Sequence, residues 1–233
     1  MNKIAAIIKK ELSSYFKTPI AYILLVIAMV VFNIFFYVII EENREATLRD
    51  VFKIMEFMFI FMIPILTMKV YSEERMSGTL EFLLTAPIKH STIILGKYLG
   101  SLAFFTLLVA LTGIYYLIIA VFGQPDHAAI LTGYLGVWLE GALFIAIGLL
   151  CSSWTKNQII SAMCSYLFIF LLYFSLSFIQ YTAETWEDLV RHISVTAHTE
   201  NLFAGIITFV DLMYFISAIG VCLVLTNLSL QKQ

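Results

Sequence analysis

The chain has 233 residues, of which 61% are apolar and 13% are charged, and its mean hydropathy is +0.93. A soluble globular protein of this length needs more charge on its surface, so the composition excludes that class and predicts a polytopic membrane protein. The formal net charge is -2 and the basic residues form no run, which gives no sign of a nucleic-acid partner.

Residues 1–18 form the first predicted element, a basic amphipathic helix. Apolar residues recur at helical spacing between its lysines, and a helix of this kind lies along an anionic membrane surface. Residues 19–40 form the first predicted span, with Pro19 in its first turn. This apolar run is too long for a signal peptide, and no small-residue cleavage pattern follows it.

Further apolar runs predict spans at residues 51–71, 91–122, 128–150, 159–181 and 211–230. Pro64 is expected to kink the second span. The third run is longer than a bilayer is thick, so its start, with Lys97, is expected to project into water. Residues 182–210 are mixed in polarity and predict short re-entrant or interfacial helices. The predicted fold is an all-α membrane protein with six transmembrane helices.

A charged stretch at residues 72–90 separates the second and third spans. Glu73, Glu74 and Arg75 end the apolar run before it. Gly78 can adopt the left-handed conformation that closes a helix. We therefore expect one short helix to end here, outside the hydrocarbon core.

A second short helix is predicted to follow at once. Thr79 is expected to be its N-cap, Glu81 lies in its first turn, and Pro87 stops it after about two turns. Its apolar face needs a partner and is formed by Leu80, Leu83 and Leu84. The alternative is a helix that lies on the membrane surface without a protein partner.

The basic residues indicate which side of the membrane the termini occupy. An even number of spans places both termini on one side, and ten of the basic residues fall on that side against four on the other. The ten are Lys3, Lys9, Lys10, Lys17, Lys69, Arg75, Lys89, Lys97, Lys156 and Lys232, and the four are Arg44, Arg49, Lys53 and Arg191. Both termini and the charged stretch are therefore predicted to be cytoplasmic.

Two acidic residues lie inside predicted spans. Glu140 falls midway along the fourth span, where an unpaired charge costs about 2.5 kcal/mol or more. It is either a pathway group or a packing residue that hydrogen-bonds to a neighbouring span or a second subunit. Glu56 lies in the second span, where Lys53 is expected to neutralise it. Gly96 and Gly100 are expected to permit close helix packing.

The sequence carries no recognisable catalytic or metal motif. HExxH and GxSxG are absent, and the three cysteines lie in or beside apolar runs without a CxxC pair. His192, His198 and Glu200 could approach one another, but we expect a solvated surface there in preference to a metal site. The chain is predicted not to be an enzyme and to hold no metal or cofactor.

Three blocks of sequence point to a family: KKELSSYFKTPIAY (9–22), IPILTMKVYSEERMSGTLEFLLTAPI (63–88) and AIGLLCSSWTKNQIISA (146–162). With these blocks the chain resembles the ABC-2 type permeases, the transmembrane subunits of ABC transporters, nearly end to end. Within that family it most resembles the permeases associated with gliding motility. A weaker match is the spacing of His198, Gly205, Asp211 and Tyr214.

The resemblance implies roles for two segments. Residues 1–18 would be the elbow helix along the inner leaflet, with Lys9, Lys10, Glu11 and Phe16 among its characteristic residues. Residues 72–90 would contain the coupling helix, which docks on a partner ATPase and transmits its closure. The matched coupling residues are Glu73, Glu74, Arg75, Gly78, Thr79, Leu80, Glu81, Leu83, Leu84 and Pro87.

The resemblance also implies partners. The chain lacks GxxxxGK[ST], so ATP and Mg are expected in a separate ABC ATPase subunit, present as a dimer. Six spans form half of a two-fold pathway, which calls for a second permease copy or a paralogue in the bacterial cytoplasmic membrane. The external segment 182–210 leaves little room for a large domain, so a substrate handled there would be captured either by other subunits, such as a periplasmic auxiliary subunit, or from the lipid.

A second hypothesis comes from a different class. The chain could be a self-sufficient secondary transporter or channel, with Glu140 and Glu56 as the ion-coupling groups. Co-purification of an ATPase would distinguish the two hypotheses. The sequence leaves the substrate open, because lipids, peptides, polysaccharide precursors and the absence of any cargo are all compatible with it.

Overall fold

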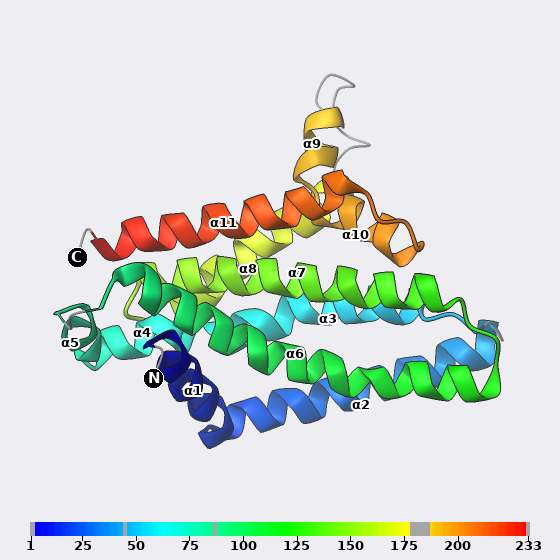
Figure 1. Ribbon diagram of the computed structural model, residues 1–233, viewed down its shortest axis with the longest axis horizontal. Coiled ribbons are helices and arrows are strands. Elements are labelled where there is room, and N and C mark those ends of the chain that lie inside the picture. Colours follow the sequence, from blue (N-terminus) through cyan, green and yellow to red (C-terminus); the bar gives the residue numbers. More distant parts are fainter. Residues whose placement is uncertain (1–2, 44–45, 86–87, 178–186, 232–233) are drawn as a thin grey trace.

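The computed structural model describes residues 3–43, 46–85, 88–177 and 187–231. Within these ranges the chain is helical and contains no strand. The helices, labelled in Figure 1, are α1 (Lys3–Lys17), α2 (Pro19–Asn43), α3 (Arg49–Thr67), α4 (Lys69–Met76), α5 (Thr79–Thr85), α6 (His90–Phe122), α7 (His127–Trp154), α8 (Gln158–Phe174), α9 (Glu187–Ile193), α10 (Val195–Phe203) and α11 (Phe209–Gln231).

Six of these helical segments are long and apolar enough to cross a membrane: α2, α3 together with α4, α6, α7, α8 and α11. The predicted all-α membrane fold is therefore confirmed. Helix α7 is the centre of the bundle and packs against α3, α6, α8, α10 and α11 (Figure 1). In its most apolar window 89% of the residues are buried, whereas the corresponding figure for α2 and α11 is 17%. The outer helices thus present apolar side chains outwards, as lipid contact requires.

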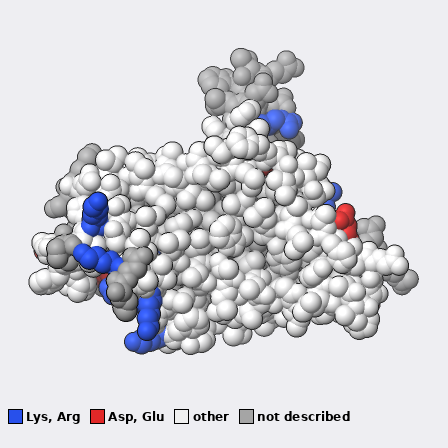
Figure 2. Space-filling view, viewed as in Figure 1, with Lys and Arg blue, Asp and Glu red and all other residues white. Residues whose placement is uncertain are grey.

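Both ends of the chain lie at one end of the bundle, together with α4 and α5 (Figure 1). We call this the basic end, because Figure 2 shows most of the Lys and Arg of this face gathered there, over α1 and its surroundings. A long surface without charged residues separates it from the opposite end. Helix α10 lies toward that opposite end and α9 projects from the side of the bundle (Figure 1), and both fall within the segment predicted to hold short helices.

The second span is interrupted four residues after Pro64. Helix α3 ends at Thr67 and α4 begins at Lys69, with Met68 between them in a helical conformation. Pro64 cannot donate a hydrogen bond to the carbonyl oxygen one turn earlier, which weakens the helix before the break, whereas the N–H of Met68 at the break still bonds to the carbonyl oxygen of Pro64 at 2.9 Å. The break lies inside a segment that as a whole is long and apolar enough to cross a membrane, and α4 is the last part of that segment.

Candidate functional site

Helices α4 and α5 form a hairpin whose turn needs a glycine. Gly78 has a φ of 74°, a left-handed value that other residues adopt at a cost. A Cβ here would meet nothing within 4 Å, so the backbone conformation and not the available space selects glycine. Helix α5 begins at Thr79 as predicted, with Glu81 in its first turn. We call residues 76–83 the hairpin tip.

The predicted N-cap role of Thr79 is wrong. Thr79 belongs to the first turn of α5, and its hydroxyl donates to the carbonyl oxygen of Glu74 at 3.2 Å. The same hydroxyl lies 2.9 Å from Ser77 Oγ, which donates to the Glu74 carbonyl as well. These hydroxyls therefore hydrogen-bond to the last turn of α4. The general preference of threonine for N-cap positions did not predict this role.

The tip exposes different apolar side chains from those predicted. Leu80 is only 3% exposed because α5 folds back and packs this side chain into the hydrophobic core, so it is not available to a second protein. Leu83 is half-buried, and the side chain of Leu84 and all of Pro87 lie outside the described residues. The exposed apolar side chains are Phe82, at 79%, and Met76, at 65%.

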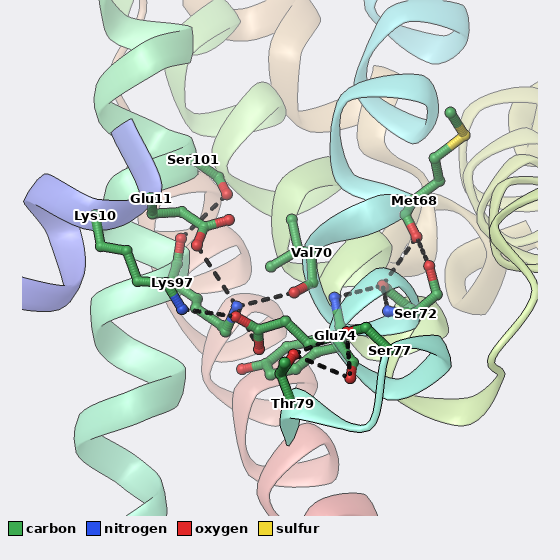
Figure 3. A network of polar contacts seen from close by, with 12 residues as sticks. Lys10, Glu11, Met68, Val70, Ser72, Glu74, Ser77, Thr79, Lys97 and Ser101 are labelled. Atoms are coloured by element: carbon green, nitrogen blue, oxygen red, sulfur yellow. Dashed lines mark hydrogen bonds and ion pairs between the residues drawn. The ribbon is translucent and has the colours of Figure 1, made fainter. Parts of the chain in front are cut away.

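Lys97 is buried at the base of the hairpin, contrary to the prediction that it projects into water. Its side chain is 2% exposed, and its Nζ lies 3.5 Å from Glu11 Oε2 and 3.0 Å from Glu74 Oε2 (Figure 3). The ammonium also donates to the carbonyl oxygen of Val70 at 2.9 Å and lies 5.1 Å from the centre of the Tyr71 ring. One cation therefore joins α1, α4 and α6.

The burial of Lys97 follows from the close packing of α1 on α6. A Cβ at Gly96 would lie 2.6 Å from Ile7, and one at Gly100 would lie 2.6 Å from Glu11. The two glycines thus let α1 lie directly on the first turns of α6, as their expected packing role requires. Helix α1 then covers the lysine.

The elbow residues take part in this network in different ways. Lys10 forms an ion pair with Glu74 Oε1 at 3.0 Å, so Glu74 connects two lysines. Glu11 is buried, and this burial raises the pKa of its carboxyl although the charge of Lys97 lowers it. Lys9 and Phe16 are exposed, and the Phe16 ring also contacts Phe104 of α6 with ring centres 5.8 Å apart.

Helix α4 is also fastened to the end of α7. Ser152 Oγ accepts hydrogen bonds from the backbone N–H groups of Tyr71 and Ser72, at 3.0 and 3.1 Å. It donates to the carbonyl oxygen of Met68 at 3.0 Å, at the break between α3 and α4. Arg75 donates to the carbonyl oxygen of Ser153 at 3.0 Å, where the α7 dipole favours a cation.

Sequence reasoning did not single out Ser152, although it lies in one of the three family blocks. Ser152→Ala should lower the free energy of unfolding by about 2 kcal/mol, because two buried backbone N–H groups lose their acceptor. Thermal or SDS-induced unfolding of the purified protein measures this loss. Ser217→Ala is the control, because Ser217 is exposed and bonds only within its own helix. Equal losses in the two variants would contradict the role given to Ser152.

At the opposite end, the weaker family match forms a contact cluster. His198 Nδ1 lies 2.7 Å from Asp211 Oδ1, and the imidazole stacks on Tyr214 with ring centres 4.1 Å apart. Gly205 has a φ of 87° in the turn between α10 and α11. Asn201 donates to the second oxygen of Asp211 at 3.2 Å. His198 is thus engaged in joining α10 to α11.

Lys53 is not the direct partner of Glu56. Lys53 pairs with Asp50 at 3.1 Å, while Glu56 is 4% exposed and accepts a hydrogen bond from the Thr199 hydroxyl at 2.6 Å. The bond ties α3 to α10. The hydrogen-bond partner of Glu56 is thus Thr199, which lies 143 positions later in the chain, and not Lys53 of the same helix.

Glu140 is fully buried in α7, and neither carboxyl oxygen has a hydrogen-bond partner among the described residues. The expected packing hydrogen bond to a neighbouring span is therefore absent from that part of the chain. Since the side chain is enclosed by its own bundle, a second subunit does not reach it in this conformation. Glu140 remains the least satisfied polar group of the described core.

Comparison with known proteins places these features in a family context. A family model described as "ABC-2 type transporter" matches residues 2–208. The matched range begins in front of α1 and ends just before α11, so it contains the hairpin tip and the whole Lys97 network. A search of curated proteins gave no match.

Proposed function

The chain belongs to the ABC-2 type transporter family and is thus a permease component of an ABC transporter, and from this premise we propose that a separate ATPase drives it through the hairpin tip. ATP and Mg would bind to that subunit, since this chain has no phosphate-binding loop motif. The energy of nucleotide binding and hydrolysis would then reach the bundle as a movement of α4 and α5.

The observation that carries the proposal is the mechanical connection of the tip. The tip exposes Phe82 and Met76 to a partner, as a docking surface requires. Directly behind it, Glu74 is bound to α1 and α6 through Lys10 and Lys97, and Arg75 is bound to α7. A displacement of the tip would therefore be transmitted to the central helix of the bundle.

The remaining partners follow from the same proposal. The basic end would face the cytoplasm of a bacterial cell, with both termini on that side of the inner membrane. A second permease copy or a paralogue would complete a two-fold pathway beside the ATPase dimer, and a periplasmic auxiliary subunit would handle cargo outside. The three family blocks support a finer placement among the permeases associated with gliding motility.

Purification of the chain from its native membrane tests the proposal directly. We expect an ABC ATPase to co-purify in stoichiometric amount and its hydrolysis rate to change when the permease is present in liposomes. Ion-coupled flux catalysed by the purified chain alone, with no ATPase bound, would contradict the proposal. It would favour the self-sufficient transporter, for which the unbonded buried Glu140 is the supporting observation.

Glu140→Gln separates a pathway role from a packing role. The substitution keeps the shape of the side chain and removes its capacity to ionise. We expect transport by the assembled complex to fall while the amount of complex stays the same, because no described hydrogen bond of the fold depends on this carboxyl. Transport assays in liposomes and size-exclusion profiles measure the two quantities. Unchanged transport would contradict any pathway role.

A further inference from the structure

A polar cleft of about 300 Å³ opens at the basic end between α1, α4, α5 and α6. Hydroxyl groups of Ser14, Ser77 and Thr79 contribute to its wall. Its charged lining is balanced, with three lysines and three glutamates: Lys10, Lys69, Lys97, Glu11, Glu73 and Glu74. Lys10, Lys97, Glu11 and Glu74 pair with one another, which leaves one charge of each sign, Lys69 and Glu73, outside that network and suits a ligand that carries both signs.

A narrow apolar pocket of about 20 Å³ lies further along the bundle. It is lined only by apolar side chains of α2, α3 and α6, among them Leu24, Leu66 and Phe104. Leu66 precedes Lys69, which lines the polar cleft, by three residues, or about one helical turn. The edge of the polar cleft thus lies about one helical turn from apolar side chains of the bundle, and the apolar pocket itself holds little more than one water molecule.

Tyr15 marks the boundary between the two spaces. Its ring stacks on Phe104 of the apolar pocket with centres 5.1 Å apart, and its hydroxyl lies 3.5 Å from the carbonyl oxygen of Leu66. On the other side, the ammonium of Lys69 lies 5.4 Å from the centre of the same ring. Polar and apolar spaces that meet at one aromatic residue match an amphiphile at a membrane surface.

We propose that this cleft binds the zwitterionic phosphoethanolamine headgroup of a phospholipid, its phosphate at Lys69 and its ammonium at Glu73, with the acyl chains in the surrounding bilayer. Lys69 donates to Thr18 Oγ1 at 2.8 Å, and an ammonium has two further protons for a phosphate. Lys69 and Glu73 are one turn apart on α4, where side chains lie about 5 to 6 Å from each other. A lipid with a net negative charge would also bind the lysine through its phosphate. Its remaining negative charge would then lie beside the glutamates.

Native mass spectrometry of the purified full chain, titrated with phosphatidylethanolamine, phosphatidylglycerol and phosphatidylcholine, tests the proposal. We expect phosphatidylethanolamine to bind most tightly, and Lys69→Gln to weaken it about tenfold because a charge-assisted hydrogen bond is lost. Lys17→Gln is the matched control: it removes the same charge from the same end, but Lys17 is exposed and does not line the cleft.

A second variant keeps the test decisive should Lys69→Gln fold poorly. Ser14 lines the cleft and is exposed, so Ser14→Trp fills the cleft without removing a described side-chain hydrogen bond. We expect this variant to lose phosphatidylethanolamine binding and to keep its melting temperature. Equal binding of the three lipids, or equal effects of Lys69→Gln and Lys17→Gln, would overturn the site. Competition by glycerophosphoethanolamine as strong as by the lipid would show that the acyl chains do not contribute and would overturn the lipid assignment.

Discussion

Lys97→Met should lower the free energy of unfolding by about 3 to 5 kcal/mol, the usual cost of removing one partner from a buried ion pair. The substitution leaves Glu11 and Glu74 without the cation that they share and the carbonyl oxygen of Val70 without its donor. Because these groups hold α1, α4 and α6 together, we also expect the complex with the ATPase to be lost. SDS-induced unfolding and co-purification measure the two effects.

The pH dependence of the Lys97→Met defect provides an independent check. Burial raises the pKa of the Glu11 carboxyl above its usual value of 4.5, and removal of Lys97 takes away the charge that opposes this rise. A raised carboxyl pKa costs stability as pH rises from the unfolded value through the folded value, since only the unfolded chain then ionises freely. The defect should therefore be smaller at acidic pH than at neutral pH.

Lys89→Met is the control for this substitution. Lys89 is exposed immediately before α6, so the same change of residue should alter the free energy of unfolding by no more than about 0.5 kcal/mol. The double variant Lys97→Met with Glu11→Gln should recover part of the loss, because one of the two unpaired carboxylates is removed. Equal stability of Lys97→Met and Lys89→Met would show that the buried cation is not needed.

Phe82→Asp should weaken the complex with the ABC ATPase about 30-fold or more. An exposed aromatic side chain at the centre of a docking surface commonly contributes 2 kcal/mol or more, which is about a factor of 30 in the dissociation constant. Phe82 is 79% exposed, so the folded chain itself does not depend on it. Titration of the purified ATPase against the permease in nanodiscs measures the constant.

Phe122→Asp is the matched control for the docking experiment. Phe122 is 86% exposed at the far end of α6, so it undergoes the same chemical change at the opposite end of the bundle. It should leave the ATPase affinity unchanged. Should Phe82→Asp leave the affinity unchanged too, the hairpin tip would instead be the membrane-surface helix that the sequence also allowed.

The fold could be predicted from the sequence because its determinants are local. Long apolar runs identify helices that cross a membrane, and Gly78 identifies the turn between α4 and α5. The apolar runs and the glycine each lie within a few residues of the helix or turn that they predict. The positions of the site side chains depend instead on contacts between distant segments.

Lys97 illustrates why the site was harder to predict than the fold. Helix length alone suggested that its end of α6 lies in water, but Glu11, 86 residues earlier, lies on an α1 helix that covers it. Leu80 was expected to face a partner and is buried by its own hairpin. A signal was present in Gly96 and Gly100, whose spacing of four marks one face of α6 as a close contact.

The contact of α1 with α6 also constrains how the protein is made. Glu11 leaves the ribosome 86 residues before Lys97, an interval of roughly 4 to 17 s at ordinary rates of synthesis. Throughout this interval Glu11 lacks the buried ion pair with Lys97 that it makes in the folded protein. The N-terminal segment, although translated first, thus cannot reach its final position before the start of α6 has been made.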